Sequence, residues 1–469
     1  MKNRSLHRVC LATALSLSLG LVSLASGIGT SSSSNEKQDE DLCWRLSCNP
    51  IIPEGTFFSD PAPRIGPDGT LWLFGSRDEK CDIYCSYSND AIETKDLKNL
   101  RLHRDVLVSR GTGDAIPGTD ALLWAPDAIF HNGKWLLFYC TPDDNHKEGI
   151  AIAPSPAGPF ADSVRLAGCN GIDPSIFRDD DGTLYYNWGQ AALHGAILKD
   201  DASGFVEGTI HDAIIDEERH NFHEGVQLTK RNGIYYLVFA DIGRRRTPSC
   251  IGYATSSSPF GPYVYRGVIV DNRGCDPNNW NNHGGIVEFG GKWYVFYHRA
   301  TNASRMMRKV CVEPIEFDAN GFIREVETTS NGAASELDPF AETPARIACE
   351  MSGNVRIVTD VDGKESLREI RTGDTAIWRY FNFQNEADGL VLRLKSFSGG
   401  QIELCDGEGA SYGRIQFQPG DGREVQEVSM HLDRPFPKGR RAIVLRFRGK
   451  GRGATLFELA SFHFTSKDQ

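Results

Sequence analysis

The sequence predicts an all-β protein, a five-bladed β-propeller followed by a β-sandwich, and three observations lead there. The 469 residues include 48 Gly, 22 Pro, 8 Trp, 14 Tyr and 25 Phe. Gly and Pro at this density favour turns, and aromatic residues favour strands. A pattern of one turn and one strand recurs five times, and no helical period follows it. The formal charge of −11 excludes a basic, nucleic-acid-binding surface as the main feature, because phosphate contacts require clustered Lys and Arg.

The first 27 residues predict a secretory signal peptide. Lys2, Arg4 and Arg8 precede the mostly apolar run 9–24, and small residues follow at 25–27. Polar residues interrupt this run and it is short for a membrane span, so we expect no span after leader removal. Residues 28–45 then predict a disordered spacer. Export to the periplasm, the cell surface or the medium permits disulfides, but the pairing of the cysteines cannot be deduced from sequence.

An internal repeat occupies residues 46–335 and predicts the propeller. Each copy is a tight glycine turn followed by an aromatic-rich strand, and the copies lie about 50–60 residues apart. The turn glycines are Gly69, Gly133, Gly182, Gly233 and Gly291. Five such units, each a small antiparallel sheet, are typical of a five-bladed propeller. A single β-sandwich is the alternative, but it would not need the same turn in the same place five times.

The register of the repeat points to a polar site. The residues nine positions before the first four glycines, and eight before the fifth, are Asp60, Trp124, Asp173, Glu224 and His283. Equivalent positions in propeller blades lie at equivalent places around the axis, so we expect these five side chains to converge at one mouth of the channel.

Three carboxylates in one register point to glycoside hydrolysis. That reaction uses one protonated carboxyl, which gives its proton to the leaving oxygen, and one ionised carboxylate, which activates water. A third acid raises the pKa of the proton donor by like-charge repulsion. Trp124 offers an apolar face to a sugar, His283 can bond a hydroxyl or orient a metal-bound water, and an acidic channel mouth attracts a cation such as Ca²⁺.

The sequence around these positions resembles the motif set of glycoside hydrolase family 43. The motifs span roughly residues 49–340 and are Phe57–Pro63, Trp124–Asp127, Gly171–Phe177, His223–Gly225 and Asn282–Gly284. The resemblance implies a five-bladed propeller of inverting enzymes, mostly α-L-arabinofuranosidases, β-xylosidases and arabinanases. It also implies Asp60 as general base, Glu224 as general acid, and Asp173 as the residue that orients Glu224 and keeps its pKa high.

The same resemblance implies a set of substrate contacts. Trp124 would shape the sugar pocket, and His283 would lie beside a structural Ca²⁺ on the propeller axis or beside its waters. Family members also bring an arginine from a late strand to the sugar, and Arg308 is the candidate here. No organic cofactor is implied.

Residues 330–345 read as a connector, and residues 346–469 predict a β-sandwich because they hold many short strand-like runs. This module resembles carbohydrate-binding module family 6 through the segments Val444–Gly449, Leu456–Phe464, Gly373–Asp374 and Trp378–Tyr380. Near the last strand, where that family has Asn and then Asp-Trp, this chain has Glu458 and then Ala460-Ser461. Trp378 and Tyr412 are candidate sugar-stacking residues, and core packing is the favoured role for Trp378.

Together these features predict a secreted, monomeric glycosidase that removes arabinofuranosyl or xylosyl units from plant-type polysaccharides or oligosaccharides. One alternative is a galactan- or galactofuranoside-active exo-glycosidase of the same fold. A catalytically silent sugar-binding propeller is another, although intact Asp60, Asp173 and Glu224 argue against it. Retaining, invertase-like propellers carry Asn-Asp-Pro and Arg-Asp-Pro motifs, where this chain has Ser59-Asp60-Pro61 and Ile172-Asp173-Pro174.

Overall fold

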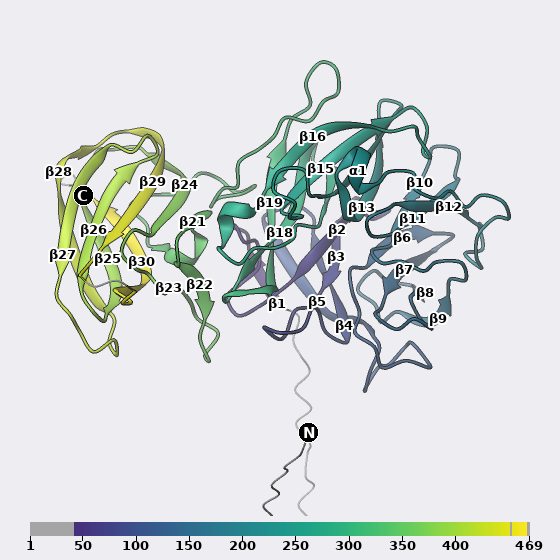
Figure 1. Ribbon diagram of the computed structural model, residues 1–469, viewed down its shortest axis with the longest axis horizontal. Helices are drawn as coiled ribbons and strands as arrows, with labels where there is room; N and C mark the ends of the chain where they lie inside the picture. Colours follow the sequence, from purple (N-terminus) through teal and green to yellow (C-terminus); the bar gives the residue numbers. More distant parts are fainter. Residues whose placement is uncertain (1–41, 451–452, 467–469) are drawn as a thin grey trace, which may run out of the picture. The chain divides into compact units, whose positions relative to one another are not determined.

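Strands account for nearly all of the regular structure in the computed structural model, which describes residues 42–450 and 453–466 (Figure 1). The described residues belong to one compact unit. Within them, no helix is both long enough and apolar enough to cross a bilayer. The signal peptide expected over 1–27 lies outside the described residues.

Five antiparallel sheets follow one another in chain order, coloured from purple to green in Figure 1. The first has the order β1-β5-β4-β3-β2, with β1 (Leu42–Arg45), β2 (Ser59–Ile65), β3 (Leu71–Ser76), β4 (Ser88–Thr94) and β5 (Asn99–Val108). The second holds β6 (Asp127–His131), β7 (Lys134–Cys140), β8 (Glu148–Ala153) and β9 (Ala161–Arg165), and the third holds β10 (Ser175–Arg178), β11 (Leu184–Trp188) and β12 (His194–Leu198). The fourth holds β13 (Phe222–Arg231), β14 (Ile234–Asp241), β15 (Cys250–Ser256) and β16 (Val264–Asp271), and the fifth holds β17 (Gly285–Phe289), β18 (Lys292–Thr301) and β19 (Ser304–Ile315). The predicted five-bladed propeller is therefore confirmed.

The repeat glycines lie in the turns between the first two strands of every blade. Their φ angles are 81°, 78°, 89°, 77° and 75° for Gly69, Gly133, Gly182, Gly233 and Gly291. A Cβ atom at any of the five would meet nothing within 4 Å. The turn therefore needs glycine for its left-handed backbone and not for close packing.

The aromatic residues of the repeat form the cores between neighbouring blades. Phe74 of the first sheet packs on Trp135 of the second, with ring centroids 5.7 Å apart, and Phe138 packs on Tyr186 of the third at 5.2 Å. The ring closes where the fifth blade meets the first, because the N–H of Phe58 donates to the carbonyl of Arg308 at 3.1 Å. This closure brings β19 beside the start of β2, where Asp60 lies.

The C-terminal residues form two further antiparallel sheets. One has the order β22-β23-β30-β25-β28, with β20 paired to β30, and the other has the order β21-β24-β29-β26-β27. Their bounds are β20 (Thr343–Pro344), β21 (Glu350–Ser352), β22 (Arg356–Thr359), β23 (Glu365–Arg368), β24 (Thr375–Phe383), β25 (Ala387–Ser396), β26 (Gly400–Asp406), β27 (Ser411–Phe417), β28 (Gln426–Phe436), β29 (Gly439–Arg448) and β30 (Phe457–Thr465). Trp378 of one sheet packs edge-on against Phe462 of the other at 4.9 Å, so a β-sandwich encloses one core, as predicted.

Three sequence expectations need correction at this level. Residues 42–45 of the expected spacer form β1, which pairs with β5 because Trp44 packs inward and its Nε1 donates to the carbonyl of Ile51 at 2.7 Å. Thr343–Pro344 of the expected connector pair with β30 instead. Tyr412 is buried under the Arg434 guanidinium, 4.2 Å from its ring, so it forms no open stacking platform, whereas the buried Trp378 has the core-packing role favoured for it. All eleven cysteines within 42–450 are unpaired.

Candidate active site

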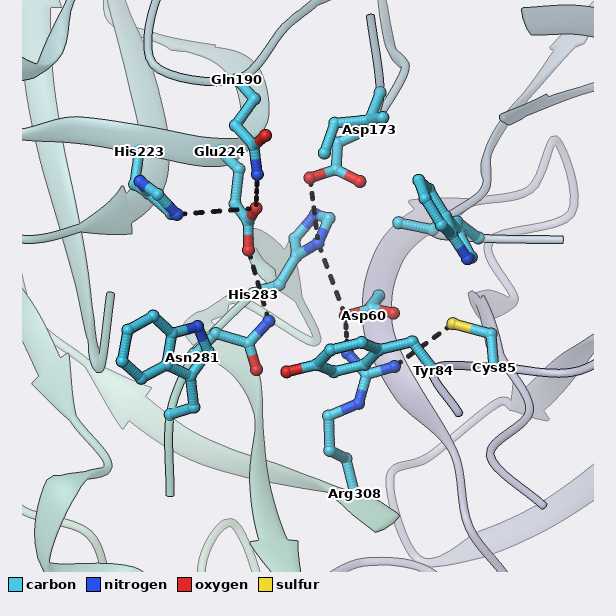
Figure 2. Close-up of a pocket in the computed structure, with 14 residues that line it drawn as sticks. Asp60, Tyr84, Cys85, Asp173, Gln190, His223, Glu224, Asn281, His283 and Arg308 are labelled. Atoms are coloured by element: carbon cyan, nitrogen blue, oxygen red, sulfur yellow. Dashed lines mark hydrogen bonds and ion pairs between the residues drawn. The ribbon is translucent and has the colours of Figure 1, made fainter. Parts of the chain in front are cut away.

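One cavity of about 210 Å³ collects every residue of the predicted register (Figure 2). Asp60, Trp124, Asp173, Glu224 and His283 all line it, and so does Arg308. The remaining polar and aromatic lining residues are Tyr84, Cys85, Gln190, His223, Trp280 and Asn281.

Irregular backbone aims the acidic side chains into the cavity. Asp60 and Asp173 adopt left-handed conformations, with φ of 53° and 58°, at or just before the first strand of their blades. Glu224 lies between two register shifts in the pairing of β13 with β14. The following residue, Gly225, has φ 67°, and a Cβ there would lie 2.8 Å from the ring of His283. Strained backbone of this kind clusters at functional sites, where the surrounding structure holds it.

Asp60 is a buried carboxylate that is held ionised. Arg308 Nη1 donates to Asp60 Oδ1 at 2.7 Å, and His283 Nδ1 lies 3.6 Å from the same oxygen. Burial alone would raise the pKa of Asp60. The Arg308 guanidinium, helped by the neighbouring His298 and His283, lowers this pKa by more than burial raises it, so it lies well below the ordinary value. Asp60 can therefore accept a proton at neutral and mildly acidic pH.

Arg308 is fixed by a second carboxylate that the sequence did not reveal. Asp78, which follows β3, accepts from Arg308 Nε at 2.8 Å, from Nη2 at 2.9 Å and from the backbone N–H at 2.9 Å. The ring of Tyr84 lies 5.1 Å from the guanidinium carbon, and Nη2 lies 3.3 Å from Cys85 Sγ. The guanidinium is thus locked between two aspartates, with one edge against Asp60.

A chain of hydrogen bonds connects Asp60 to Glu224. The backbone N–H of Asp60 donates to His298 Nδ1 at 3.2 Å, and burial lowers the pKa of His298 to about 3, so its ring is neutral. With Nδ1 as acceptor, Nε2 carries the proton and faces Asn281 Oδ1 at 3.2 Å. Asn281 Nδ2 in turn donates to Glu224 Oε1 at 3.3 Å. His298 is fully buried and lies outside the predicted register.

Glu224 lies at the open end of the site, with its side chain 13% exposed. Gln190 Nε2 donates to Glu224 Oε2 at 2.7 Å, and His223 Nε2 lies 3.8 Å from that oxygen. The other ring nitrogen of His223 lies 2.7 Å from an oxygen of Glu217 in the short helix α1 (Glu217–His220). Figure 2 shows these groups converging on Glu224 from one side, with Asp60 and Arg308 on the other.

Asp173 interacts with both other acids, and its pKa is shifted in the opposite direction to that of Asp60. Burial raises the pKa of Asp173 well above its ordinary value, and the charges of Glu224 and Asp60 raise it further. His283 Nδ1 lies 3.9 Å from Asp173 Oδ2, and burial lowers the pKa of His283. The surroundings therefore favour the charged form of Asp60 and disfavour the charged form of Asp173, next to Glu224.

The side chains at the axis do not fit a directly ligated calcium ion. Ca²⁺ takes six to eight oxygen ligands. Within residues 42–450 and 453–466, no three His, Cys, Asp or Glu side chains are grouped to hold a metal. His283 offers only a ring nitrogen, and its Nδ1 faces Asp60 and Asp173.

Several site residues were missed by the sequence reasoning because they lie outside the repeat register. They are Asp78, Tyr84, Cys85, Gln190, His223, Trp280, Asn281 and His298. Asn281 and Trp280 precede His283 by two and three residues, and His223 precedes Glu224. Their closeness in sequence to the register positions could have indicated that they line the same cavity. The loop that holds Asp78 to Cys85 carried none, because the other blades contain no counterpart to it.

Comparisons with known proteins point the same way. The family model described as Glycosyl hydrolases family 43 matches residues 49–323. A protein named xylosidase/arabinosidase from Thermoclostridium stercorarium is 27% identical over 86% of this chain and 96% of its own length. An arabinoxylan arabinofuranohydrolase from Bacillus subtilis (strain 168) is 27% identical over 73% of this chain and 75% of its own length.

Solved structures share the fold. A Bacillus subtilis arabinoxylan arabinofuranohydrolase of family 43, in complex with cellotetraose, aligns at a TM-score of 0.51 and 23% identity over 89% of this chain and 97% of its own. A β-xylosidase/α-arabinofuranosidase from a compost metagenome, in complex with xylotriose and in a calcium-free form, aligns at 0.52 and 25% identity over 61% of this chain and 99% of its own.

Proposed function

The chain belongs to glycosyl hydrolase family 43, and on that premise we propose that it removes α-L-arabinofuranosyl or β-xylosyl units from arabinoxylan-type polysaccharides or oligosaccharides, with inversion at the anomeric carbon. The observation that carries the proposal is the charge asymmetry of the cavity. Asp60 is held ionised by Arg308, while burial and the charges of Glu224 and Asp60 disfavour a negative charge on Asp173, so the Asp173–Glu224 side of the cavity tends to retain a proton. Inverting hydrolysis needs one carboxylate that accepts a proton and one carboxyl that gives one.

In this mechanism Asp60 is the general base and Glu224 the general acid. Asp60 takes a proton from a water molecule, whose oxygen forms a bond to the anomeric carbon. The bond from that carbon to the leaving oxygen breaks, and Glu224 gives its proton to that oxygen. The sugar, the leaving alcohol and one consumed water balance the reaction, and a proton exchange with solvent resets Asp60 and Glu224.

The neighbouring side chains have supporting roles in this proposal. Asp173 and Glu224 repel each other's negative charge, so ionisation of both together is disfavoured and the pair tends to retain a proton. Gln190 and Asn281 hold the two Glu224 oxygens in place. Trp124 forms a wall for the sugar ring, and His283 spaces Asp60 from Asp173. No step is assigned to calcium, because the donors do not fit a direct cage.

We also propose how the rest of the chain serves this activity. Residues 1–27 would be a leader that exports the enzyme, residues 46–335 the catalytic domain, and residues 346–469 an appended module that resembles carbohydrate-binding module family 6. The burial of Trp378 and Tyr412 argues against sugar stacking at those two residues. Affinity gels of the whole protein with xylan, arabinan and galactan, run with a Trp124→Ala variant to weaken the catalytic pocket, test the module directly.

A substrate screen tests the proposed function. Nitrophenyl α-L-arabinofuranoside and β-xyloside should be hydrolysed faster than the galactoside and galactofuranoside, and proton NMR should show the inverted anomer as the first product. Hydrolysis of only the galactosides would favour the galactan-active alternative. A retained anomer would contradict the roles given to Asp60 and Glu224, and no turnover on any glycoside or polysaccharide would favour the silent binding propeller.

A further inference from the structure

The strand that carries Arg308 is held from its other side by the sandwich. Lys309 follows Arg308 in β19, and successive side chains of a strand point to opposite faces, so Lys309 points away from Asp60. Its Nζ forms an ion pair with Glu365 of β23, and the two side chains are 0% and 1% exposed. A fully buried ion pair therefore joins the two modules directly behind the active-site arginine.

Glu365 binds both chain segments that carry the Asp60–Arg308 pair. Besides Lys309, Glu365 Oε1 accepts the backbone N–H of Gly55 at 3.1 Å, and Gly55 lies five residues before Asp60. Lys309 Nζ also donates to the carbonyl of Pro53 at 3.0 Å. One carboxylate of the sandwich thus ties together the start of the first blade and the last strand of the fifth.

The turn between β18 and β19 is fixed by the same part of the sandwich. Asn302, at φ 57°, donates its backbone N–H to the carbonyl of Ile357 at 2.8 Å. Its side chain donates to Thr359 Oγ1 at 3.1 Å and accepts the Thr359 N–H at 2.7 Å. Further along β18, Arg299 Nη1 donates to the carbonyl of Ala348 at 2.6 Å. The hairpin is held at its turn, along one strand and beside Arg308.

We propose that Glu365 is a positioning residue for the active site: the sandwich clamps the β18–β19 hairpin so that Arg308 stays against Asp60. A buried ion pair compensates its desolvation only in a well-defined geometry, so the Lys309–Glu365 pair favours a single placement of β19. This inference rests on the proposed function, because Asp60 acts there as the general base. It gives the C-terminal module a part in catalysis that requires no sugar binding by the module itself.

The test replaces Glu365 in the full-length protein. Glu365→Gln keeps the shape of the side chain and leaves Lys309 without its charge partner. We expect kcat on the best substrate of the screen to fall about 10- to 100-fold, since small misplacements of catalytic groups have effects of this size, with KM changed less than about twofold. The matched control is Glu342→Gln, in an exposed ion pair of the sandwich with Arg393, whose side chains are 52% and 47% exposed.

The dependence of kcat/KM on pH distinguishes a role of Glu365 in placing Arg308 from a role in stability alone. Asp60 is faced by charged or titratable groups on several elements, namely Arg308, His298, His283, Asp78, Asp173, Glu224, Tyr84 and Cys85. Of these, only Arg308 is on the clamped strand and adds a positive charge at neutral pH. The acidic limb of kcat/KM should therefore move to higher pH in Glu365→Gln and stay in place in Glu342→Gln. A lower melting temperature with an unmoved limb and wild-type kcat would overturn the proposal.

Two further variants keep the test decisive if Glu365→Gln folds poorly. Asn302→Gly tolerates φ 57° and removes the side-chain contacts with Thr359 and Thr301, so it should shift the limb in the same direction without a buried unpaired charge. Lys309→Met combined with Glu365→Met removes both charges, and should recover melting temperature while the limb stays shifted. Recovery of the limb as well would show a purely structural role.

Hydrogen exchange tests the clamp without using activity. Glu365→Gln should increase exchange in peptides over 299–310 and 53–62, and Glu342→Gln should not. Unchanged exchange in those peptides overturns the clamp, even for a protein that hydrolyses nothing. A wild-type protein with no hydrolysis would refute the proposed function instead, so the two failures are distinguishable.

Discussion

Replacing Arg308 by Met tests how the site keeps Asp60 ionised. Met retains the apolar bulk but removes the 2.7 Å contact to Asp60 and the contacts of 2.8 and 2.9 Å to Asp78. Burial of Asp60 is then opposed only by the smaller effects of His298, His283 and Ser76, so its pKa should rise from below the ordinary value of 3.8 toward about 6. The acidic limb of kcat/KM should move from below the ordinary Asp range to about pH 6, so activity at pH 5 falls about 10-fold or more while the loss at pH 8 from this cause is small.

The free energy of unfolding of Arg308→Met should be lowered most at neutral pH, whereas its kcat/KM should be lowered most at acidic pH. In the wild type the pKa of Asp60 is lowered on folding, so the carboxylate stabilises the protein above its unfolded pKa, and this stability is lost as the pH falls through the folded pKa. In Arg308→Met the folded pKa lies above the unfolded one. The variant should therefore be less stable by about 3–5 kcal/mol at neutral pH and recover toward acidic pH.

The assay is kcat/KM from pH 4 to 9 with a discontinuous product measurement, together with chemical denaturation at pH 5 and pH 8. Arg305→Met is the matched control, because Arg305 is an exposed residue of the same strand that lies over the ring of Trp280 at 5.3 Å. Its acidic limb should match the wild type. A pH-independent loss in Arg308→Met would refute the reasoning and leave Arg308 as a sugar contact only.

Other substitutions give separate tests of the site. Asp173→Asn removes the repulsion between the ionised forms of Asp173 and Glu224, so the basic limb of kcat/KM should move to lower pH, and an unmoved limb would contradict the role of Asp173. Gly225→Ala places a Cβ 2.8 Å from the His283 ring at φ 67°, and should lower the free energy of unfolding by about 1–3 kcal/mol in chemical denaturation. Asp78→Asn should lower it by about 3–5 kcal/mol, because the arginine stays buried with less charge compensation. The acidic limb in Asp78→Asn should not move upward, since Asp60 keeps its own contact with that arginine.

The repeat made the acidic core of the site predictable. A propeller places equivalent blade positions at equivalent points around its axis, so Asp60, Asp173, Glu224 and His283 could be assigned to one cavity without any contact information. Arg308 was reachable only through the family resemblance, because it lies in the third strand of its blade and outside the register.

The rest of the site depends on loops and on contacts that the repeat does not encode. Asp78 and Tyr84 come from the irregular segment after β3, which no other blade duplicates. His298 lies in the middle of β18, where a strand pattern predicts an ordinary core position, and only the fold brings its ring under Asp60. The ion pair between Lys309 and Glu365 joins residues from two modules, and a pattern within either module does not specify it.

In the fold, too, local sequence features could be predicted, and features set by distant contacts could not. The five blade turns follow from glycine and aromatic spacing, since both are local features. Strand β28 (Gln426–Phe436) alternates Val428, Met430 and Leu432 with polar residues, but its other positions are polar and exposed at the edge of the sheet, so its sequence signal is weak. Strand β1 was assigned to a spacer because its flanks are polar, yet its pairing with β5 is set by residues far along the chain.

Glu224→Gln on an unactivated arabinoxylan oligosaccharide tests the central claim most directly. The amide keeps one oxygen that can accept from Gln190 or Asn281, and it has no acidic proton to give to the leaving oxygen. We expect kcat/KM to fall by about 10²–10⁴-fold, with an unchanged melting temperature and a smaller loss on nitrophenyl glycosides, whose leaving group needs less help. Glu288→Gln, at an exposed glutamate of β17, should match the wild type. Full activity of Glu224→Gln on the oligosaccharide would contradict the account.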